Sequence, residues 1–201
     1  MTPTGKTART AAPLHPLLAS RWSPRALDPR HELDDVALTA LLEAARWAPS
    51  ASNTQPWRFA ITLRGTAEHA AVLDALAPGN RAWAHAASAL VVAAAETVAP
   101  DGAVRPWALY DTGQAVAHLS VQAEHESLAV HQLGGFDRDR LRAVLAGPGT
   151  VEPLVVLAVG RRDETVELPE PFAGREAAPR TRLPLDELLL GVDVRDQDVA
   201  A

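Results

Sequence analysis

The sequence predicts a fold that mixes helices and strands, of the α+β or the α/β class. Two observations carry this prediction. Apolar residues recur with helical spacing in some segments, and in others they alternate with polar residues or form short unbroken runs. The chain has 201 residues, of which 47% are hydrophobic and 22% charged, and this composition can bury the core of one sizeable domain.

The expected elements follow one another along the chain. Residues 31–47 have a helical apolar face that begins after a capping Asp34 or Asp35 and ends before Pro49. Residues 57–64 alternate apolar and polar side chains, which is typical of a half-buried strand. The other expected helices are 67–76, 80–87, 107–127 and 136–147 with Gly147 as its stop, and the other expected strands are 88–96, 129–133 and 152–161. Pro78 and Gly79 are expected to end the helix that precedes them.

The two ends of the chain differ from the middle. Residues 1–13 are small, polar and Pro-containing, so we expect a flexible N-terminus. Residues 14–190 are expected to form a single domain. Its last part, about 163–190, is Pro-rich, charged and too long for a bare loop, so we expect an arm that wraps around another surface. Residues 191–201 are expected to be a flexible tail.

Composition argues against several classes of protein. The chain has no cysteine, which excludes disulfides, thiolate metal sites and cysteine nucleophiles. A net charge of −6 argues against a general nucleic-acid binder. The apolar run 89–95 is far shorter than the ~20 residues that span a bilayer, so no membrane partner is expected. The N-terminus lacks an apolar signal core, and we expect a cytoplasmic protein.

Histidine is a common metal ligand, but the spacing of the histidines in this sequence does not predict a metal site. His125 and Glu126 begin like H-E-x-x-H, but Ala129 stands where the second histidine is needed. His118 and His125 lie two helical turns apart, a spacing that many surface helices show. We therefore expect no metal.

A polar loop, 49–55, separates the first long helix from the first strand. The stretch reads "RWAPSASNTQPWRF", in which small polar side chains offer donors and acceptors but little apolar area. It is either an ordinary loop or a polar cradle for a ligand.

Arginines are paired at two places. "RWSPR" puts Arg21, Ser23 and Arg25 on one face of an extended segment, and "RTR" does the same for Arg180 and Arg182. The planar guanidinium suits a phosphate, especially where two of them meet one dianion. The alternative is solvated charge on mobile ends of the chain.

Together these segments resemble the nitroreductase family of FMN-dependent oxidoreductases. The resemblance rests on "RWSPR", "AARWAPSASNTQPWRF", "LGGFDRDRLRAVL" and "RTRLPL", in the family's order, and covers about residues 18–190. It implies a mixed sheet flanked by helices, in an intertwined homodimer with FMN at the interface. It also implies hydride transfer from NADH or NADPH, then reduction of a nitroaromatic, quinone or enone by a ping-pong mechanism. No side chain is expected to be catalytic, because flavin N5 carries the hydride.

Other functions of the same fold stay open. One is a flavin-sequestering or storage protein without turnover, in which residues 163–179 form a lid. Another is an enzyme that modifies the flavin itself. The sequence identifies neither the acceptor nor the preferred nicotinamide.

The resemblance also implies which residues contact the cofactor. They are Arg21, Trp22, Ser23, Arg25, Pro49, Ser50, Asn53, Asn80, Asp111, Leu133, Gly134, Gly135, Arg180 and Arg182. The four arginines are expected to converge on the phosphate, with Arg25 also near the pyrimidine edge of the ring. The polar loop is expected to reach the partner subunit's flavin. Asp111 is expected to contact the ribityl chain, and Asn80 the pyrimidine edge.

Two further groups complete the expected site. The backbone of Gly134 and Gly135 is expected to approach flavin N5, in a turn for which a positive φ would suit glycine. The alternative is that these glycines only end a strand. Trp83, Trp107 and Phe172 are candidate walls of the open flavin face, and each could instead belong to the core.

Overall fold

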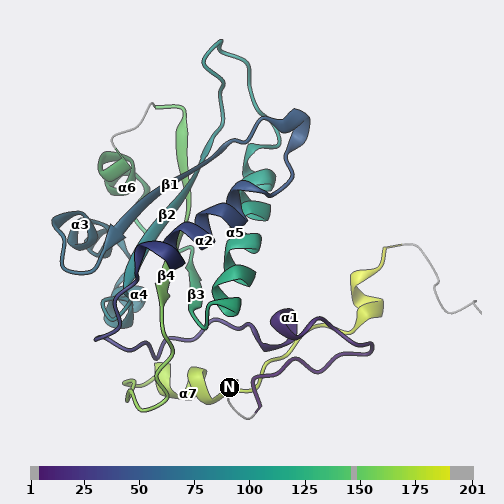
Figure 1. The fold of residues 1–201 in the computed structure, drawn as a ribbon, viewed down its shortest axis with the longest axis vertical. Coiled ribbons are helices and arrows are strands. Elements are labelled where there is room, and N and C mark those ends of the chain that lie inside the picture. The colour runs from purple at the N-terminus through teal and green to yellow at the C-terminus, as the bar shows by residue number, and fades with distance from the viewer. Residues whose placement is uncertain (1–4, 146–148, 191–201) are drawn as a thin grey trace, which may run out of the picture.

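The centre of the fold is a four-stranded sheet in the order β1 (Trp57–Leu63), β2 (Ala89–Glu96), β4 (Val151–Gly160), β3 (Ala129–Leu133) (Figure 1). The computed structural model describes residues 5–145 and 149–190. The expectations for the first four residues, for Gly147 and for 191–201 therefore lie outside the described residues. All three strand pairings are antiparallel, whereas a mixed sheet was expected.

Helices cover both faces of this sheet, which confirms the expected layers (Figure 1). One layer holds α2 (Asp35–Arg46) and α5 (Ala108–His125). The other holds α3 (Ala67–Ala75), α4 (Pro78–Ala84) and α6 (Arg138–Leu145). The short helices α1 (Pro16–Ser20) and α7 (Phe172–Ala177) and the 3₁₀ turns η1 (Ala51–Asn53) and η2 (Leu185–Leu188) complete the described elements. Of these, α1 and α7 lie beyond one end of the sheet.

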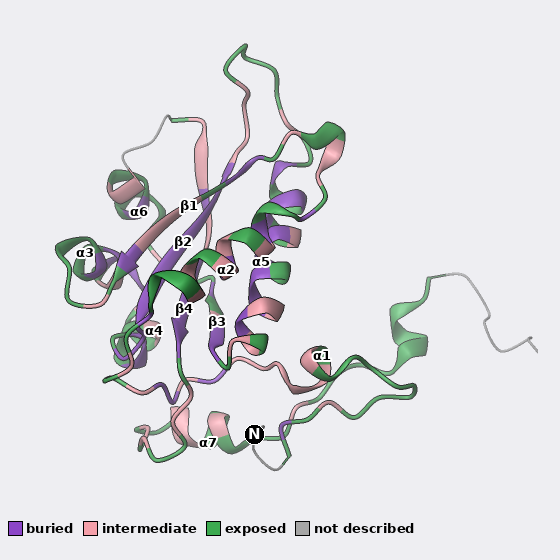
Figure 2. Ribbon diagram, viewed as in Figure 1, coloured by how far each residue is buried: buried purple, intermediate pink, exposed green. Residues whose placement is uncertain are grey.

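The core is built from the two central strands, which are buried along most of their length (Figure 2). Strand side chains alternate between the faces, so Val91 packs towards α2 and α5 while Val92 packs towards α3, α4 and α6. β2 contributes alanines at Ala93, Ala94 and Ala95, all fully buried. These small side chains leave room for helices to pack closely against both faces.

Local chemistry explains most element boundaries. The Asp34 carboxylate accepts a hydrogen bond from the N–H of Ala37 at 2.7 Å, which caps α2 as expected. α3 ends at Ala75, before Pro78 as expected, but Pro78 also begins α4, two residues before the expected start at Asn80. Proline suits a first helical turn, where its missing N–H leaves no hydrogen bond unmade. The helix α7 within the Pro-rich arm was not expected.

No helix of residues 5–145 and 149–190 is long and apolar enough to cross a membrane. Within the same residues, no group of three or more His, Asp or Glu side chains is placed to hold a metal ion. His118 and His125 are exposed on α5.

Candidate functional site

The "RWSPR" segment is fixed at both of its ends. Upstream, the Arg180 guanidinium donates to the carbonyl oxygen of Ala19 at 2.7 Å. Downstream, the Asp28 N–H donates to the carbonyl oxygen of Arg161 at 2.9 Å, where the chain leaves β4. The segment is therefore held between α1 and the end of the central sheet, although it belongs to no helix or strand itself.

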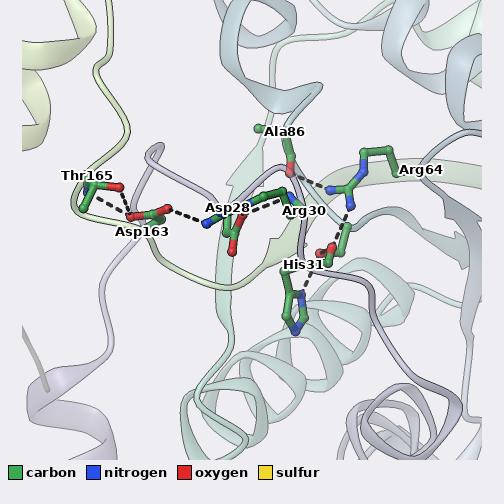
Figure 3. Close-up of polar contacts among 8 residues, drawn as sticks. Asp28, Arg30, His31, Arg64, Ala86, Asp163 and Thr165 are labelled. Carbon is green, nitrogen blue, oxygen red and sulfur yellow. Dashed lines mark hydrogen bonds and ion pairs between the residues drawn. The ribbon is translucent and has the colours of Figure 1, made fainter.

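A polar network extends this anchoring beyond Asp28 (Figure 3). The Asp28 carboxylate accepts from the backbone N–H and the Nε of Arg30, and Arg30 also lies 3.8 Å from the Asp163 carboxylate. The Arg64 guanidinium donates to the carbonyl oxygen of His31 at 2.7 Å and to that of Ala86 at 3.1 Å. These contacts tie the segment after "RWSPR" to β1, to the start of β2 and to the C-terminal arm.

Three of the expected arginines lie close to one another. Burial lowers the pKa of the Arg21 guanidinium, and the positive charge of Arg182 lowers it further. Burial and the charges of Arg21 and Arg182 lower the pKa of Arg180 in the same way. Among the described residues, the Arg21 side chain makes no hydrogen bond or ion pair. Partly buried like charges of this kind suit an anion.

Arg25 does not join this cluster, which corrects the expected convergence of four arginines. Its guanidinium lies 3.9 Å from the Glu176 carboxylate and 5.8 Å from the Trp83 ring centre. Glu176 also accepts from the backbone N–H groups of Arg25 at 2.9 Å and Ala26 at 3.1 Å. Glu176 therefore fixes both the backbone and the side chain of Arg25. Its expected place at the pyrimidine edge stays a prediction.

Trp22 occupies the opposite face of the same segment. Its indole Nε1 is buried and has no hydrogen-bond partner among the described residues. The ammonium of Lys6 lies 4.5 Å from the centre of its ring. Because neighbouring residues of an extended segment point to opposite sides, Trp22 faces away from Arg21 and Ser23. Its side chain lines a cavity that the arginines do not share.

The glycine turn lies at the end of β3, after the buried Leu133. The carbonyl oxygen of Gly135 accepts from the Ala77 N–H at 3.0 Å and from the Asn80 amide at 3.1 Å. Asn80 thus holds the turn in place. Neither Gly134 nor Gly135 has a positive φ, so that expectation is wrong. A Cβ at Gly134 would meet no atom within 4 Å, and its backbone is open to a ligand from outside the chain.

The polar loop has an unusual backbone. Ser52, Asn53 and Gln55 have φ values of 50°, 54° and 46°, which residues other than glycine rarely adopt. The Ser50 hydroxyl accepts from the Gln55 N–H at 3.1 Å and closes the loop on itself. Such conformations persist only where surrounding contacts enforce them, and they concentrate at ligand sites. Asn53 and Pro49 are exposed, so the loop presents its polar edge outwards.

Asp111 fixes this loop, and its expected contact with the ribityl chain stays a prediction. It is 2% exposed, and its carboxylate accepts from the N–H of Ala51 at 3.1 Å. Asp111 lies in the first turn of α5, while Glu124, whose charge acts on the arginine cluster, lies near its other end. Thirteen residues of helix separate them by roughly 20 Å. The loop and the arginines of one chain are therefore too far apart to bind the same phosphate-bearing end of a ligand.

The three candidate wall residues differ in burial. Trp83 is 2% exposed and packs in the core with Val92 and Leu133, which favours the core alternative for this residue. Phe172 of α7 is partly buried against the same cluster. Trp107 is 60% exposed at the start of α5 and remains available to a ligand or to another chain.

Sequence reasoning missed His131, which supports the site from β3. Its ring lies 4.6 Å from that of Trp83, and its Nδ1 lies 3.0 Å from the carbonyl oxygen of Pro24. A carbonyl only accepts, so Nδ1 carries the proton and donates. Burial lowers the pKa of His131 to about 4. The neutral imidazole thus holds the middle of the "RWSPR" segment against the sheet.

This lowered pKa predicts a dependence of stability on pH. The pKa of about 4 in the folded chain lies below the unfolded value of 6.5, so the stabilisation is complete above pH 6.5. It is lost as the pH falls from 6.5 towards 4, and about 2–3 kcal/mol of unfolding free energy should disappear. Urea denaturation at several pH values measures this. His131→Gln should flatten the profile; an unchanged slope in this variant would contradict the assignment.

The fold defines a class of α/β/α protein, and its arginine cluster suits an anionic ligand. Comparison with known proteins gives the family. The model of the nitroreductase family matches residues 18–161, and the chain belongs to this family. The expected family and the expected enzyme class, an oxidoreductase, are thereby confirmed.

Individual relatives agree with this membership. A crystal structure of an oxidoreductase containing FMN is 31% identical and superposes with a TM-score of 0.87, covering 96% of this chain and 98% of that one. An NADH dehydrogenase of Thermus thermophilus is 28% identical, over 76% of this chain and 83% of its own length. An uncharacterized 15.4 kDa protein of Mycolicibacterium smegmatis is 34% identical, over 58% of this chain and 78% of its own length.

Proposed function

We propose that this chain is an FMN-dependent oxidoreductase that takes hydride from NADH or NADPH and reduces an electron-poor acceptor, such as a nitroaromatic, a quinone or an enone. The single observation that carries the proposal is the cluster of Arg21, Arg180 and Arg182. A partly buried guanidinium that has no partner among residues 5–145 and 149–190, next to two like charges, fits the phosphate of FMN. Membership of the nitroreductase family supports the same cofactor.

The chain's residues would bind and orient the cofactor. The three arginines would hold the phosphate, and the Ser23 hydroxyl lies on the same face of the segment for the ribityl chain. Arg25, fixed by Glu176, would face the pyrimidine edge, where negative charge accumulates on reduction. The open backbone of Gly134 would allow close approach to N5. FMN itself supplies the hydride chemistry when bound, so no side-chain acid or base is required.

The separation of the polar loop from the arginines supports a homodimer in which each loop serves the other chain's flavin. Large apolar side chains are exposed near the loop and along the C-terminal arm, and this surface suits a partner chain. They are Trp47, Val104, Trp107, Leu109, Tyr110, Leu183, Leu185, Leu188, Leu189 and Leu190. The C-terminal arm, about 163–190, would wrap around the second chain.

Mixing two defective chains tests this arrangement. One chain carries Arg180→Ala and Arg182→Ala, and the other carries Ser50→Ala and Asn53→Ala. If loop and arginines meet in trans, a mixed dimer has one site with both defects and one with none, so half of the sites in the mixed dimers should be restored. Flavin content and light scattering measure this. Mixed dimers in which every site stays defective would contradict the exchange, as would a monomer that retains flavin.

Stopped-flow mixing of the FMN-loaded protein with NADH and NADPH tests the proposed turnover. We expect the yellow flavin band to bleach rapidly and to return when a quinone or nitroaromatic is added. A storage protein of the same fold would keep its band, because the open face of the ring would be covered. A flavin-modifying enzyme would leave an altered spectrum that the acceptor does not reverse. Either of these outcomes would overturn the reductase proposal.

A further inference from the structure

The N-terminal segment runs beside the C-terminal arm, and Lys6 joins the two (Figure 1). Its ammonium donates to the carbonyl oxygen of Ala178, and its own carbonyl oxygen accepts from the Arg180 guanidinium at 2.7 Å. Lys6 is 7% exposed, which is rare for a lysine. We propose that Lys6 is a positioning residue for the flavin phosphate, because it holds Arg180 and Arg21 together in the arginine cluster. This role rests on the proposed function, since it concerns the same phosphate.

The backbone contacts of Arg180 fix the orientation of its guanidinium. Nη1 donates to the carbonyl oxygens of Lys6 and Ala19, each at 2.7 Å. The Ala19 oxygen also accepts from the N–H of Ala8 at 2.9 Å, so the N-terminal segment closes around this nitrogen. A guanidinium is planar and also carries donors on Nη2 and Nε, which keep a fixed direction relative to Nη1. Lys6 therefore helps to set the direction in which Arg180 meets an anion.

Lys6 also contacts the segment that carries Arg21. Its ammonium lies 4.5 Å from the centre of the Trp22 ring. A cation over the face of an indole is attracted by the negative charge of that face. Trp22 directly follows Arg21 in the chain, so this contact restrains the backbone from which Arg21 projects. One lysine thus contacts both of the segments that supply Arg21 and Arg180.

The arginine cluster needs such a restraint because its members repel one another. Burial and the neighbouring positive charges lower the pKa values of Arg21 and Arg180. Burial also lowers the pKa of the Lys6 ammonium, but there the Glu176 carboxylate of the arm opposes the shift. Like charges separate unless the chain holds them, and a site that is held in advance binds its ligand more tightly. Loss of the Lys6 contacts should therefore weaken the binding of a phosphate in particular.

Titration calorimetry of the Lys6→Met variant with FMN and with riboflavin tests this role. Methionine keeps an unbranched side chain beside Trp22 but cannot donate to Ala178. We expect FMN affinity to fall about tenfold and riboflavin affinity to stay within about twofold, because only FMN carries the phosphate. Equal weakening of both flavins would indicate a merely structural role, and this result or an unchanged FMN affinity would overturn the proposal. Arg9→Met removes an exposed charge from the same segment and, as the control, should change neither affinity.

A double-mutant cycle separates positioning from direct attraction between the Lys6 charge and the phosphate. If Lys6 acts through Arg180, Lys6→Met should change the FMN affinity of the Arg180→Ala variant by less than about twofold. A further tenfold loss would show that Lys6 attracts the phosphate itself, and would overturn the positioning role. If Arg180→Ala alone leaves FMN affinity unchanged, the phosphate clamp of the proposed function fails, and the role of Lys6 fails with it. If Arg180→Ala weakens FMN binding but Lys6→Met does not, only the role of Lys6 fails.

Lys6 is the only lysine of the sequence, so its amine can be followed in the parent protein, which covers the case that Lys6→Met fails to fold. Acylation by acetic anhydride requires the amine to leave the carbonyl oxygen of Ala178. If Lys6 and the phosphate stabilise the same arrangement of Arg180, the coupling is reciprocal. FMN should then slow the acylation of Lys6 at least about fivefold, and riboflavin should not, as measured by mass spectrometry of the Lys6 peptide. Equal acylation rates with the two flavins would refute the coupling.

Discussion

Replacing Arg180 and Arg182 together by alanine is expected to weaken FMN binding by at least about 100-fold and to leave riboflavin binding nearly unchanged. Each charge-assisted hydrogen bond to the phosphate contributes roughly 1.5–3 kcal/mol, and riboflavin has no phosphate to lose. Titration calorimetry with both flavins measures the difference. In the parent protein FMN should bind far more tightly than riboflavin. Equal affinity there would contradict a phosphate clamp.

The single variants separate binding from structure. Arg180 also donates to the carbonyl oxygens of Lys6 and Ala19, so its loss loosens the N-terminal segment as well as the clamp. Arg182 is exposed, and its guanidinium donates only to the carbonyl oxygen of Thr181 among the described residues. Arg182→Ala should therefore reduce FMN affinity without a change in unfolding free energy. Arg46→Ala, a surface arginine paired with Glu43, is the matched control and should alter neither.

Periodicity predicted the individual helices and strands because each pattern depends on neighbours close in sequence. The alternation of residues 57–63 gave β1, and the helical face of 35–46 gave α2. Pro78 is an ambiguous signal, because a proline can follow the end of one helix or stand in the first turn of the next. The start of α4 was missed for that reason. The α7 helix was missed because Pro and charged residues around it hide a short helix of six residues.

The site was predicted through its motifs and missed where it depends on distant partners. The contact between Glu176 and Arg25 joins residues 151 positions apart, and no local pattern in the sequence reports it. The hydrogen bond from the Ala51 N–H of the polar loop to the Asp111 carboxylate spans 60 positions. These contacts set Arg25 apart from the other three arginines and fix the polar loop, and they form only in the folded chain.

Substitution of the glycine turn is expected to have the other large effect on flavin chemistry. A Cβ at Gly135 would lie 3.1 Å from the Asn80 amide nitrogen and 3.3 Å from the Cβ of Ala77. Both neighbours also donate to the carbonyl oxygen of Gly135, so they cannot move away without losing these bonds. Gly135→Val should therefore displace the turn, cost about 1–3 kcal/mol of unfolding free energy and weaken FMN binding at least tenfold.

Gly134→Ala distinguishes a flavin contact from a mere strand end, because its methyl group would meet no atom of the chain within 4 Å. The unfolding free energy of the protein without flavin should stay within about 0.5 kcal/mol of the parent. If the ring lies against this backbone, the added methyl pushes it away, and hydride transfer from NAD(P)H should slow at least tenfold. Gly149→Ala, which also meets no atom within 4 Å, controls for the substitution itself. A Gly134→Ala variant that binds FMN and is reduced at the parent's rate would show that the turn only ends β3.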